Sequence, residues 1–502
     1  CVGIGTSVMT EAVTAAAAGS IGIGFYALTA LTSGAGNVAV GHNSLMTATT
    51  EIGNTVMGYE AGKSIRHDSS DHNVIMGYQA SVGGTGARTQ SVAIGYRAWG
   101  NGGSANNLGG SENVFIGAES GGGTWATGAS DGNTAVGWNT MKGAMNAAGL
   151  NTAVGKSALG ALTEGDNNVA VGASALASLT TGSKNIAIGF DAGKAITTAN
   201  RNIAIGYEAL RTEDADGDRT TAVGYTALYS QNGTTEAMAN TGIGYATGYY
   251  NVTGTNNTYL GYQAGTGASG YSNSNNVGIG ASAMKIIRTG DENVAVGTEA
   301  MKDAQTASNN VAIGQQSLQN MTSGSSNVAI GKVALDGASV NPSNSTAVGY
   351  AASRYAQGNN NTSLGHSALK GVSGFDGTDN VAIGYEAMDA VTDGESANVS
   401  IGYGSMGAVN ESSSHHADAN IAIGYNALTG GTLTDGNLSH NIAIGYEALD
   451  ATGANDQLGT IAIGYAALGA LTSGAGNTAV GYQALDATTT GNYNTVVGYQ
   501  AA

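Results

Sequence analysis

The chain repeats a short apolar segment in which large and small side chains alternate. The consensus Asn-Val-Ala-Ile-Gly-Tyr-x-Ala-Leu recurs from one end of the sequence to the other. Its glycine occurs in 28 copies, and consecutive copies are 16 to 22 residues apart. Alternation with a period of two predicts a short β-strand before each glycine. Because the strand has no polar face, we expect it to be buried on both sides.

A unit of this size cannot bury a core of its own, so neighbouring units must stack on one another. The sequence therefore predicts an all-β fold, a parallel β-roll or β-solenoid of about 28 coils that spans residues 1–502 as one array. We expect two short strands and two turns in each coil. The segments between motifs are rich in Gly, Ser, Thr and Asn, which favour turns. The longest insertions fall at 96–136 and 403–444 and are candidate receptor-binding loops.

The two sides of the strand predict two different roles. We expect the large aliphatic residue before each glycine to fill the interior of the coil. The residue before that is Ala in 17 copies, and we expect this small face to meet other chains at close range. The predicted interior ladder includes Ile188, Ile205, Val223, Ile313, Ile423 and Ile444, and the predicted inter-chain face includes Ala187, Ala204, Ala312 and Ala329.

Composition narrows the class of protein further. Among 502 residues there are 82 Gly, one Pro and one Cys, and only 10% of residues are charged. Collagen would need Gly at every third position and abundant Pro, and one Cys cannot build a disulfide scaffold. The net charge of −18 argues against binding to nucleic acid, and no apolar run is long enough to insert into a membrane.

The repeat resembles the head repeat of trimeric autotransporter adhesins, of the YadA type, in a form also found in long phage tail and virion fibre proteins. The Asn-Val-Ala-Ile-Gly motif carries this resemblance, and Gly481–Asn494 is closer to the phage form. The resemblance implies a left-handed parallel β-roll and a parallel homotrimer. Most intervals here are 17 residues or more, longer than in the adhesin heads, and neither a heptad stalk nor an anchor accompanies the repeat.

The leading hypothesis is a structural fibre, the extracellular trimeric shaft of a phage tail or virion fibre used in host attachment. The alternatives are the head of a bacterial surface adhesin and a self-assembling extracellular filament. A cell-surface glycan or protein is the expected receptor. We expect no enzymatic activity and no cofactor. Both ends fall inside a repeat, so we expect the chain to be part of a longer protein with caps and anchors elsewhere.

Tyr follows the motif glycine in 15 copies, which predicts a ladder of stacked rings along the array. An alternative role for this ladder is a sugar-binding or electron-relay stripe. The three Trp residues, Trp99, Trp125 and Trp138, lie in one irregular region, where they either fill a wider coil or stack on glycans. The ladder includes Tyr207, Tyr225, Tyr446 and Tyr465.

Three segments have the residue types of metal ligands, but no metal site is predicted from them, and a fourth matches a dinucleotide motif. Arg66–His72 and His415–Asp418 combine His with carboxylates, yet sequence proximity does not supply the converging geometry that a transition metal needs. Asp214–Asp218 begins like a calcium loop but lacks the Gly and Glu that an EF-hand requires. Gly402–Gly407 matches G-x-G-x-x-G without the strand-turn-helix context of a dinucleotide site.

Overall fold

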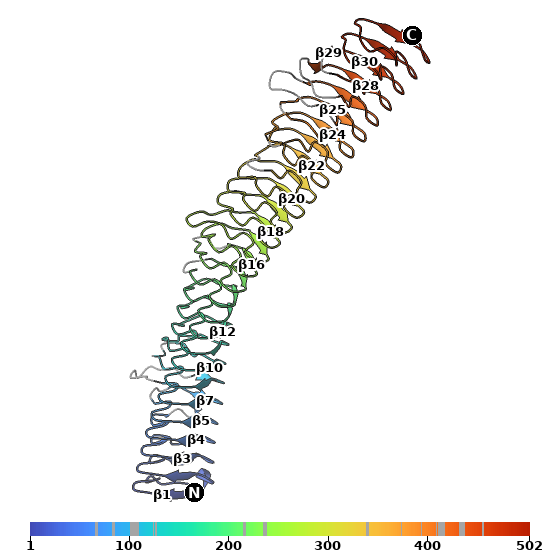
Figure 1. Cartoon of the computed structure of the whole chain (residues 1–502). Helices are drawn as coiled ribbons and strands as arrows, with labels where there is room; N and C mark the ends of the chain where they lie inside the picture. The colour runs from blue at the N-terminus through green and yellow to red at the C-terminus, as the bar shows by residue number, and fades with distance from the viewer. Residues whose placement is uncertain are drawn as a thin grey trace. The chain divides into compact units, whose positions relative to one another are not determined.

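The computed structural model shows an all-β chain built of stacked coils. It describes residues 1–65, 69–82, 86–100, 110–123, 125, 128–213, 217–233, 238–337, 341–372, 374–392, 394–407, 409, 417–430, 437–453 and 456–501. These residues form two compact units, Cys1–Thr255 and Asn256–Ala502. Within each unit the strands stack one upon the next in chain order (Figure 1). The fold is a parallel β-solenoid.

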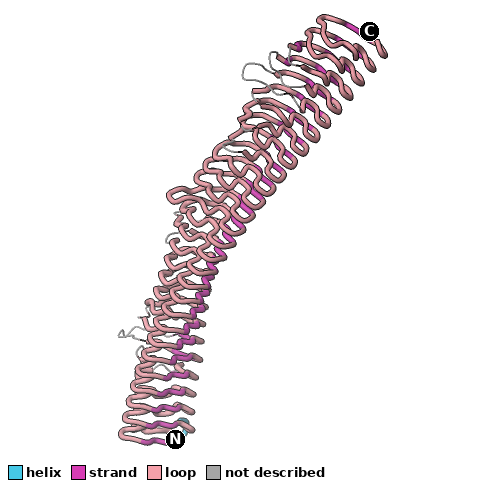
Figure 2. Tube along the Cα trace, viewed as in Figure 1, coloured by secondary structure: helices cyan, strands magenta, loops and turns pink. Residues whose placement is uncertain are grey.

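One three-residue strand ends directly before each motif glycine. In each unit these strands form one stripe along the coils, and most of the rest of each coil is loop (Figure 2). In the first unit they are β1 (Val2–Ile4), β2 (Ile21–Ile23), β3 (Val38–Val40), β4 (Thr55–Met57), β5 (Val74–Met76), β7 (Val92–Ile94), β9 (Val114–Ile116), β10 (Thr134–Val136), β11 (Thr152–Val154), β12 (Val169–Val171), β13 (Ile186–Ile188), β14 (Ile203–Ile205), β15 (Thr221–Val223) and β16 (Thr241–Ile243).

The second unit repeats this arrangement. Its strands are β17 (Thr258–Leu260), β18 (Val277–Ile279), β19 (Val294–Val296), β20 (Val311–Ile313), β21 (Val328–Ile330), β22 (Thr346–Val348), β23 (Thr362–Leu364), β24 (Val381–Ile383), β25 (Val399–Ile401), β26 (Ile421–Ile423), β28 (Ile442–Ile444), β30 (Ile461–Ile463), β31 (Thr478–Val480) and β32 (Thr495–Val497). All pairings within a unit are parallel and keep the motif in register, so that Ala170 pairs with Ala187 and Val171 with Ile188.

The prediction of two strands in every coil is wrong for most coils. Among the described residues, second strands occur only as the pairs β6 (Arg88–Thr89) with β8 (Gly110–Ser111) and β27 (Leu438–Ser439) with β29 (Gln457–Leu458). Elsewhere the chain after the glycine adopts left-handed dihedral angles, with φ of 51° at Glu208 and 50° at Leu210. A single helical turn, η1 (Ala15–Ala17), is the only helix in the described part of the chain.

These left-handed residues still take part in hydrogen bonding between coils. The N–H of Glu208 donates to the carbonyl of Phe190 in the preceding coil at 2.9 Å. The N–H of Leu210 donates to the carbonyl of Ala227 in the following coil at 3.0 Å. These backbone N–H groups therefore have hydrogen-bond partners although the residues are not in strands. The hydrogen bonds between coils offset the conformational free energy of the left-handed dihedral angles.

A ladder of buried asparagines runs through the interior of each unit. The side-chain oxygen of Asn168 accepts the backbone N–H of Asn185 at 2.9 Å and its side-chain amide at 3.1 Å. That amide also donates to the carbonyl of Ala199 at 2.9 Å, and the oxygen of Asn185 in turn accepts the N–H of Asn202 at 3.0 Å. Asn168 and Asn185 are fully buried, and both the oxygen and the amide nitrogen of Asn185 are hydrogen-bonded, so the ladder fixes the register of one coil on the next.

The motif glycine is required by close approach of the coils. Gly189 has φ of 137°, and a Cβ placed there would lie 2.3 Å from the carbonyl oxygen of Gly206 in the next coil. No L side chain fits at that distance, because the blocking atom is backbone and cannot move aside. This requirement accounts for the recurrence of glycine at that one position of the motif.

The predicted roles of the two strand sides are reversed in the structure. Ala187, Ala204, Ala312 and Ala329 are at most 1% exposed and lie inside the coil, so they cannot form an inter-chain face. By contrast, Ile188 and Ile313 are 40% and 39% exposed, and the other predicted interior residues, Ile205, Val223, Ile423 and Ile444, are half-buried on the outer side. The expected face assignment was wrong.

The reason for the reversal is the limited width of the interior. Leucines and methionines from the turn four residues after the glycine, such as Leu210 and Leu228, already fill it. At Gly242, which stands at the alanine position, an added Cβ would lie 2.8 Å from Cγ of Leu228. In most coils the strand therefore contributes no more than a methyl group to the interior and turns its large side chains outward.

In two coils where the alanine position carries an aromatic residue, the turn carries a glycine in compensation. Phe115 is fully buried at the alanine position of β9, and a Cβ at Gly121 would lie 2.6 Å from its ring. Tyr259 in β17 faces Gly265 in the same way, at 2.3 Å. Volume is therefore exchanged between strand and turn within one coil, as close packing of a protein interior requires.

This exchange predicts strong coupling between Tyr259 and Gly265. Gly265→Leu alone places a side chain against the Tyr259 ring and should cost roughly 1–3 kcal/mol or more of unfolding free energy. Tyr259→Ala alone leaves a cavity and should cost about 3–5 kcal/mol. The double variant rebuilds the Ala–Leu pair of other coils and should recover most of the loss in denaturant unfolding. As a control, Tyr259→Ala is combined with Thr306→Ala, which changes an exposed residue, and the two losses of unfolding free energy should simply add. If the losses also add when Tyr259→Ala is combined with Gly265→Leu, the packing of Tyr259 against Gly265 is contradicted.

Candidate functional site

The outward side chains of the strands form a largely apolar surface in each unit, here called the aliphatic face. It consists of the first residue of every three-residue strand, which is Val, Ile or Thr, and the third, which is Ile, Val, Leu or Met. In β13, Ile186 and Ile188 are 36% and 40% exposed on either side of the fully buried Ala187. None of the residues in these three-residue strands is charged. Since the strands are in register, each outward position continues as an unbroken row from coil to coil.

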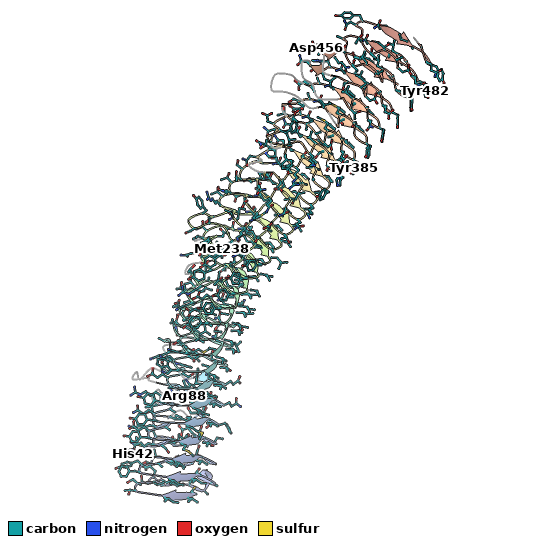
Figure 3. All side chains as sticks on the ribbon, in the orientation of Figure 1. His42, Arg88, Met238, Tyr385, Asp456 and Tyr482 are labelled. Carbon is teal, nitrogen blue, oxygen red and sulfur yellow. The ribbon has the colours of Figure 1, made fainter. Side chains whose placement is uncertain are left out.

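Beside the aliphatic face runs a second row, the tyrosine ladder, formed by the residue after each motif glycine. In the second unit it comprises nine consecutive rings stacked face to face at centroid distances of 4.9–5.2 Å. Tyr385 and Tyr482 lie on the same edge of this unit (Figure 3). The nine rings are Tyr350, His366, Tyr385, Tyr403, Tyr425, Tyr446, Tyr465, Tyr482 and Tyr499.

The first unit carries two shorter stacks of the same kind. One runs from Phe25 through His42 to Tyr96, and the other runs from Phe190 to Tyr245. Of the predicted ladder residues, Tyr207 stacks on Tyr225 and Tyr446 on Tyr465, each pair at 5.1 Å. Their planes are nearly parallel, at 8° and 6°.

This stacking decides which part of each ring can meet a ligand. The rings within a stack cover one another's faces, and only their edges and hydroxyl groups point outward. A sugar packs its C–H groups against the face of an aromatic ring. The continuous stacks therefore do not offer the surface that the alternative of a sugar-binding stripe requires.

The three tryptophans divide between the interior and the surface. Trp99 and Trp125 are at most 2% exposed and contact Phe115, so they fill a wider coil. The guanidinium of buried Arg88 lies 5.1 Å from the Trp99 ring centroid and donates to the Ser81 hydroxyl at 2.8 Å. Burial lowers the pKa of Arg88 to about 10. Trp138 is 49% exposed, and the Lys156 ammonium lies 4.8 Å from its centroid.

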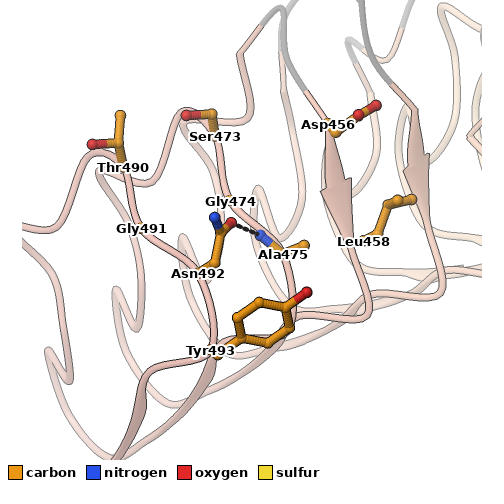
Figure 4. A pocket seen from close by; sticks show the side chains of 9 residues that line it. All are labelled: Asp456, Leu458, Ser473, Gly474, Ala475, Thr490, Gly491, Asn492 and Tyr493. Atoms are coloured by element: carbon orange, nitrogen blue, oxygen red, sulfur yellow. Dashed lines mark hydrogen bonds between the residues drawn. The ribbon is translucent and has the colours of Figure 1, made fainter.

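An open groove of about 630 Å³ lies on the turn side of the second unit. Figure 4 shows its nine lining residues, among which Asp456 and Tyr493 carry ionisable side chains. The side-chain oxygen of Asn492 accepts the N–H of Ala475 at 2.7 Å, and Asp456 accepts the N–H of Asn437 at 2.8 Å. These side chains thus serve to bridge one turn to the next.

The candidate ligand segments are only partly described. Arg66, His67, Asp68, Asp214, Ala215, Asp216, His415 and His416 lie outside the described residues. Of the remaining carboxylates, Asp71 accepts the N–H of Ile52 at 2.8 Å, and Asp218 forms an ion pair with Arg201 at 2.8 Å. Within the described ranges, no three His, Cys, Asp or Glu residues converge as a metal site.

A pair of carboxylates in the turn after β24 is held in an unfavourable environment. Partial burial, together with the nearby Glu386 carboxylate, raises the pKa of Asp389 to about 6, and Lys370 offsets this only in part. Asp450 stands at the equivalent position after β28, where burial and the Glu447 carboxylate again raise its pKa. The ionised carboxylates of Asp389 and Asp450 therefore lower the stability of the folded chain.

No protein-family model matches this chain, and a search of curated proteins finds no match. In the described part of the chain, no helix has the length and apolar character needed to cross a membrane.

Sequence reasoning missed the aliphatic face because it placed those residues inside. A signal for the correct assignment was present in the pairing of Phe115 with Gly121 and of Tyr259 with Gly265. A large residue at the alanine position that is matched by a glycine in the turn indicates that the two share one interior. The asparagine of the motif was also assigned no role, although it recurs with the strand.

Because the pKa of Asp389 is raised, Asp389→Asn should increase the stability of the fold by an amount that depends on pH. The folded chain binds this proton more tightly than the unfolded chain does, so the charged carboxylate destabilises the fold above about pH 6. That penalty disappears as the pH falls below the ordinary value of 3.8. Asp389→Asn should raise the urea midpoint at pH 7.5 and leave it unchanged near pH 3.5. An equal change at both pH values would show that the carboxylate charge is not the cause.

Proposed function

We propose that this chain is a structural fibre protein, the shaft of a homotrimeric phage tail or virion fibre used in host attachment. The aliphatic face is the observation that carries the proposal. Large apolar surfaces on a chain of this kind usually mark contact with another protein. Here the third residue of every three-residue strand is Ile, Val, Leu or Met and is partly or fully exposed, with Ile188 and Ile313 about two-fifths exposed in the single chain.

The periodicity of the aliphatic face supports a copy of the same chain as the partner. Its rows repeat once per coil, at the ~4.8 Å spacing of neighbouring strands in a sheet. A globular partner matches such a repeat over a few coils at most. A second copy that lies parallel matches it along the whole face, so each added coil adds the same contact. Repetition of one contact along a shared axis produces a long, stable rod.

The number of copies is taken from the resemblance of the repeat to trimeric adhesin heads and phage fibres. In the proposed assembly the aliphatic faces of three chains meet at the common axis, and the buried alanines hold the interior of each coil. The tyrosine ladder borders this interface, and the turns and longer loops point away from it. The turns are the surface available to a glycan or protein receptor.

The proposed role is mechanical and does not involve catalysis or a cofactor. Backbone and asparagine hydrogen bonds join each coil to the next, and apolar contact joins the three chains. The net charge of −18 is carried largely by turns, where it favours solubility. We place the fibre outside the cell, on the surface of the particle that carries it.

The assembly predicts a specific effect of charge on the aliphatic face. Ile188→Glu combined with Ile313→Glu places carboxylates from all copies close together in an apolar contact, so the trimer should dissociate. Sedimentation and light scattering should show three chain masses for the unmodified protein and one for the variant. Circular dichroism should be unchanged, because both side chains already face outward.

A matched control carries the same added charge on the turn side. Thr181→Glu combined with Thr306→Glu alters two exposed turn residues and should leave the mass at three chains. A monomeric unmodified protein would contradict the proposal. So would a variant with Glu on the aliphatic face that keeps the mass of the unmodified assembly.

A further inference from the structure

The tyrosine ladder of the second unit brings phenol rings together at an unusual density. From Tyr385 to Tyr499 the ladder contains seven tyrosines in consecutive coils and no other ring type. Neighbouring centroids are 4.9–5.2 Å apart, and the planes differ by 6–12°. Each phenol therefore has another phenol in contact on one or both faces.

These rings are also accessible from solvent. Tyr446, Tyr465 and Tyr482 are 42–43% exposed along their outer edges. The carbon atoms next to the hydroxyl group lie at the outer end of the ring, so the exposed edge includes the atoms at which phenols couple. A soluble oxidant can thus reach the ladder without opening a coil.

Carboxylates stand beside part of the ladder. Glu386 follows Tyr385 and Glu447 follows Tyr446 in the chain, and each carboxylate acts on the neighbouring phenol. Hydrogen bonding with Glu386 raises the pKa of Tyr385, and the charge of Glu447 raises that of Tyr446. These phenols stay protonated at neutral pH, and the adjacent carboxylate is placed to accept the proton when an electron is removed.

We propose that the ladder from Tyr385 to Tyr499 is a site of oxidative cross-linking, at which tyrosines in neighbouring coils couple covalently as dityrosine. The reagent is a soluble one-electron oxidant. The links join one coil to the next within a chain and so staple the solenoid along its axis. This inference concerns residues outside the aliphatic face and does not rest on the proposed trimer.

The reaction consumes two equivalents of oxidant for each link. Each phenol loses one electron to the oxidant and one proton to a carboxylate or water, which leaves two phenoxyl radicals. The radicals combine through a bond between the Cε atoms of the two rings. The hydrogen on each joined carbon then moves to the oxygen of its own ring, which restores both aromatic rings. The product is lighter than the two tyrosines by two hydrogen atoms.

The chain allows the effect of ring stacking on tyrosine coupling to be separated from the effect of solvent exposure. Tyr493 is 81% exposed, more than any ladder tyrosine, but it lies over Gly476 and no ring stacks on it among the described residues. If exposure alone governed coupling, Tyr493 would be the preferred site. If the ladder governs it, links should join tyrosines one coil apart, such as Tyr446 with Tyr465.

The test uses the whole chain and ruthenium(II) tris-bipyridine, illuminated with persulfate as the electron acceptor. Dityrosine is followed by its fluorescence, and the linked residues are identified by mass spectrometry after cleavage at Asp. Asp450 and Asp456 separate Tyr446 from Tyr465, so a link between them yields two joined peptides. We expect these joined peptides, in a chain that still runs as a monomer on a denaturing gel and unfolds at a higher temperature.

Two substitutions sharpen the result. Tyr465→Phe keeps the stacked ring but removes the phenol, so the links to Tyr446 and to Tyr482 should both be lost. Tyr493→Phe should leave the pattern and yield of links unchanged. Absence of dityrosine, an equal yield through Tyr493, or links that join different chains on the denaturing gel would each overturn the proposal. A monomeric chain with ladder links would refute the trimer and leave this inference standing.

Discussion

The structure depends on hydrogen bonds that run along the stack and hold each coil in register with the next. The backbone of the strand supplies one set, the left-handed turn residues a second, and the buried asparagines a third. In the asparagine ladder the side-chain oxygen of Asn168 accepts two N–H groups from Asn185 in the next coil. A coil displaced by one residue would lose the ladder and would bring a side chain against the backbone where Gly189 now approaches Gly206. The buried asparagines and the close glycine contacts thus fix the register of each coil on the next.

Every surface property follows from this register. Because equivalent residues stack directly over one another, a single sequence position becomes a row along the unit. The first and third strand positions become the aliphatic face, the position after the glycine becomes the tyrosine ladder, and the turn positions become rows of polar side chains. A chain built in this way presents extended surfaces with one repeat, and it contrasts with a globular protein, whose sites are isolated clusters.

Much of the architecture could be predicted from the sequence, because each position of the repeat occurs in many copies and its preferred residue types can be compared. The strand before Gly189 and the turn after it were both apparent from alternation and turn residues. The direction in which Ala187 and Ile188 point could not be deduced from alternation, since both sides of the strand are apolar. The width of the interior decides that direction, and it depends on how far leucines such as Leu228 reach across the coil. Propensity also missed the left-handed residues at Glu208 and Leu210, because their dihedral angles are favoured by bonds to neighbouring coils and not by residue type.

The central claim is that the methyl side of the strand faces the interior and the large aliphatic side faces a second copy of the chain. Thiol accessibility tests it most directly, in a background where Cys1→Ser removes the exposed free cysteine. The thiol introduced by Ala187→Cys should stay unlabelled by a polar maleimide until the chain unfolds. The thiol introduced by Ile188→Cys should label in the dissociated chain and become protected as chains associate. Faster labelling at position 187 than at position 188 in the folded chain would contradict the account.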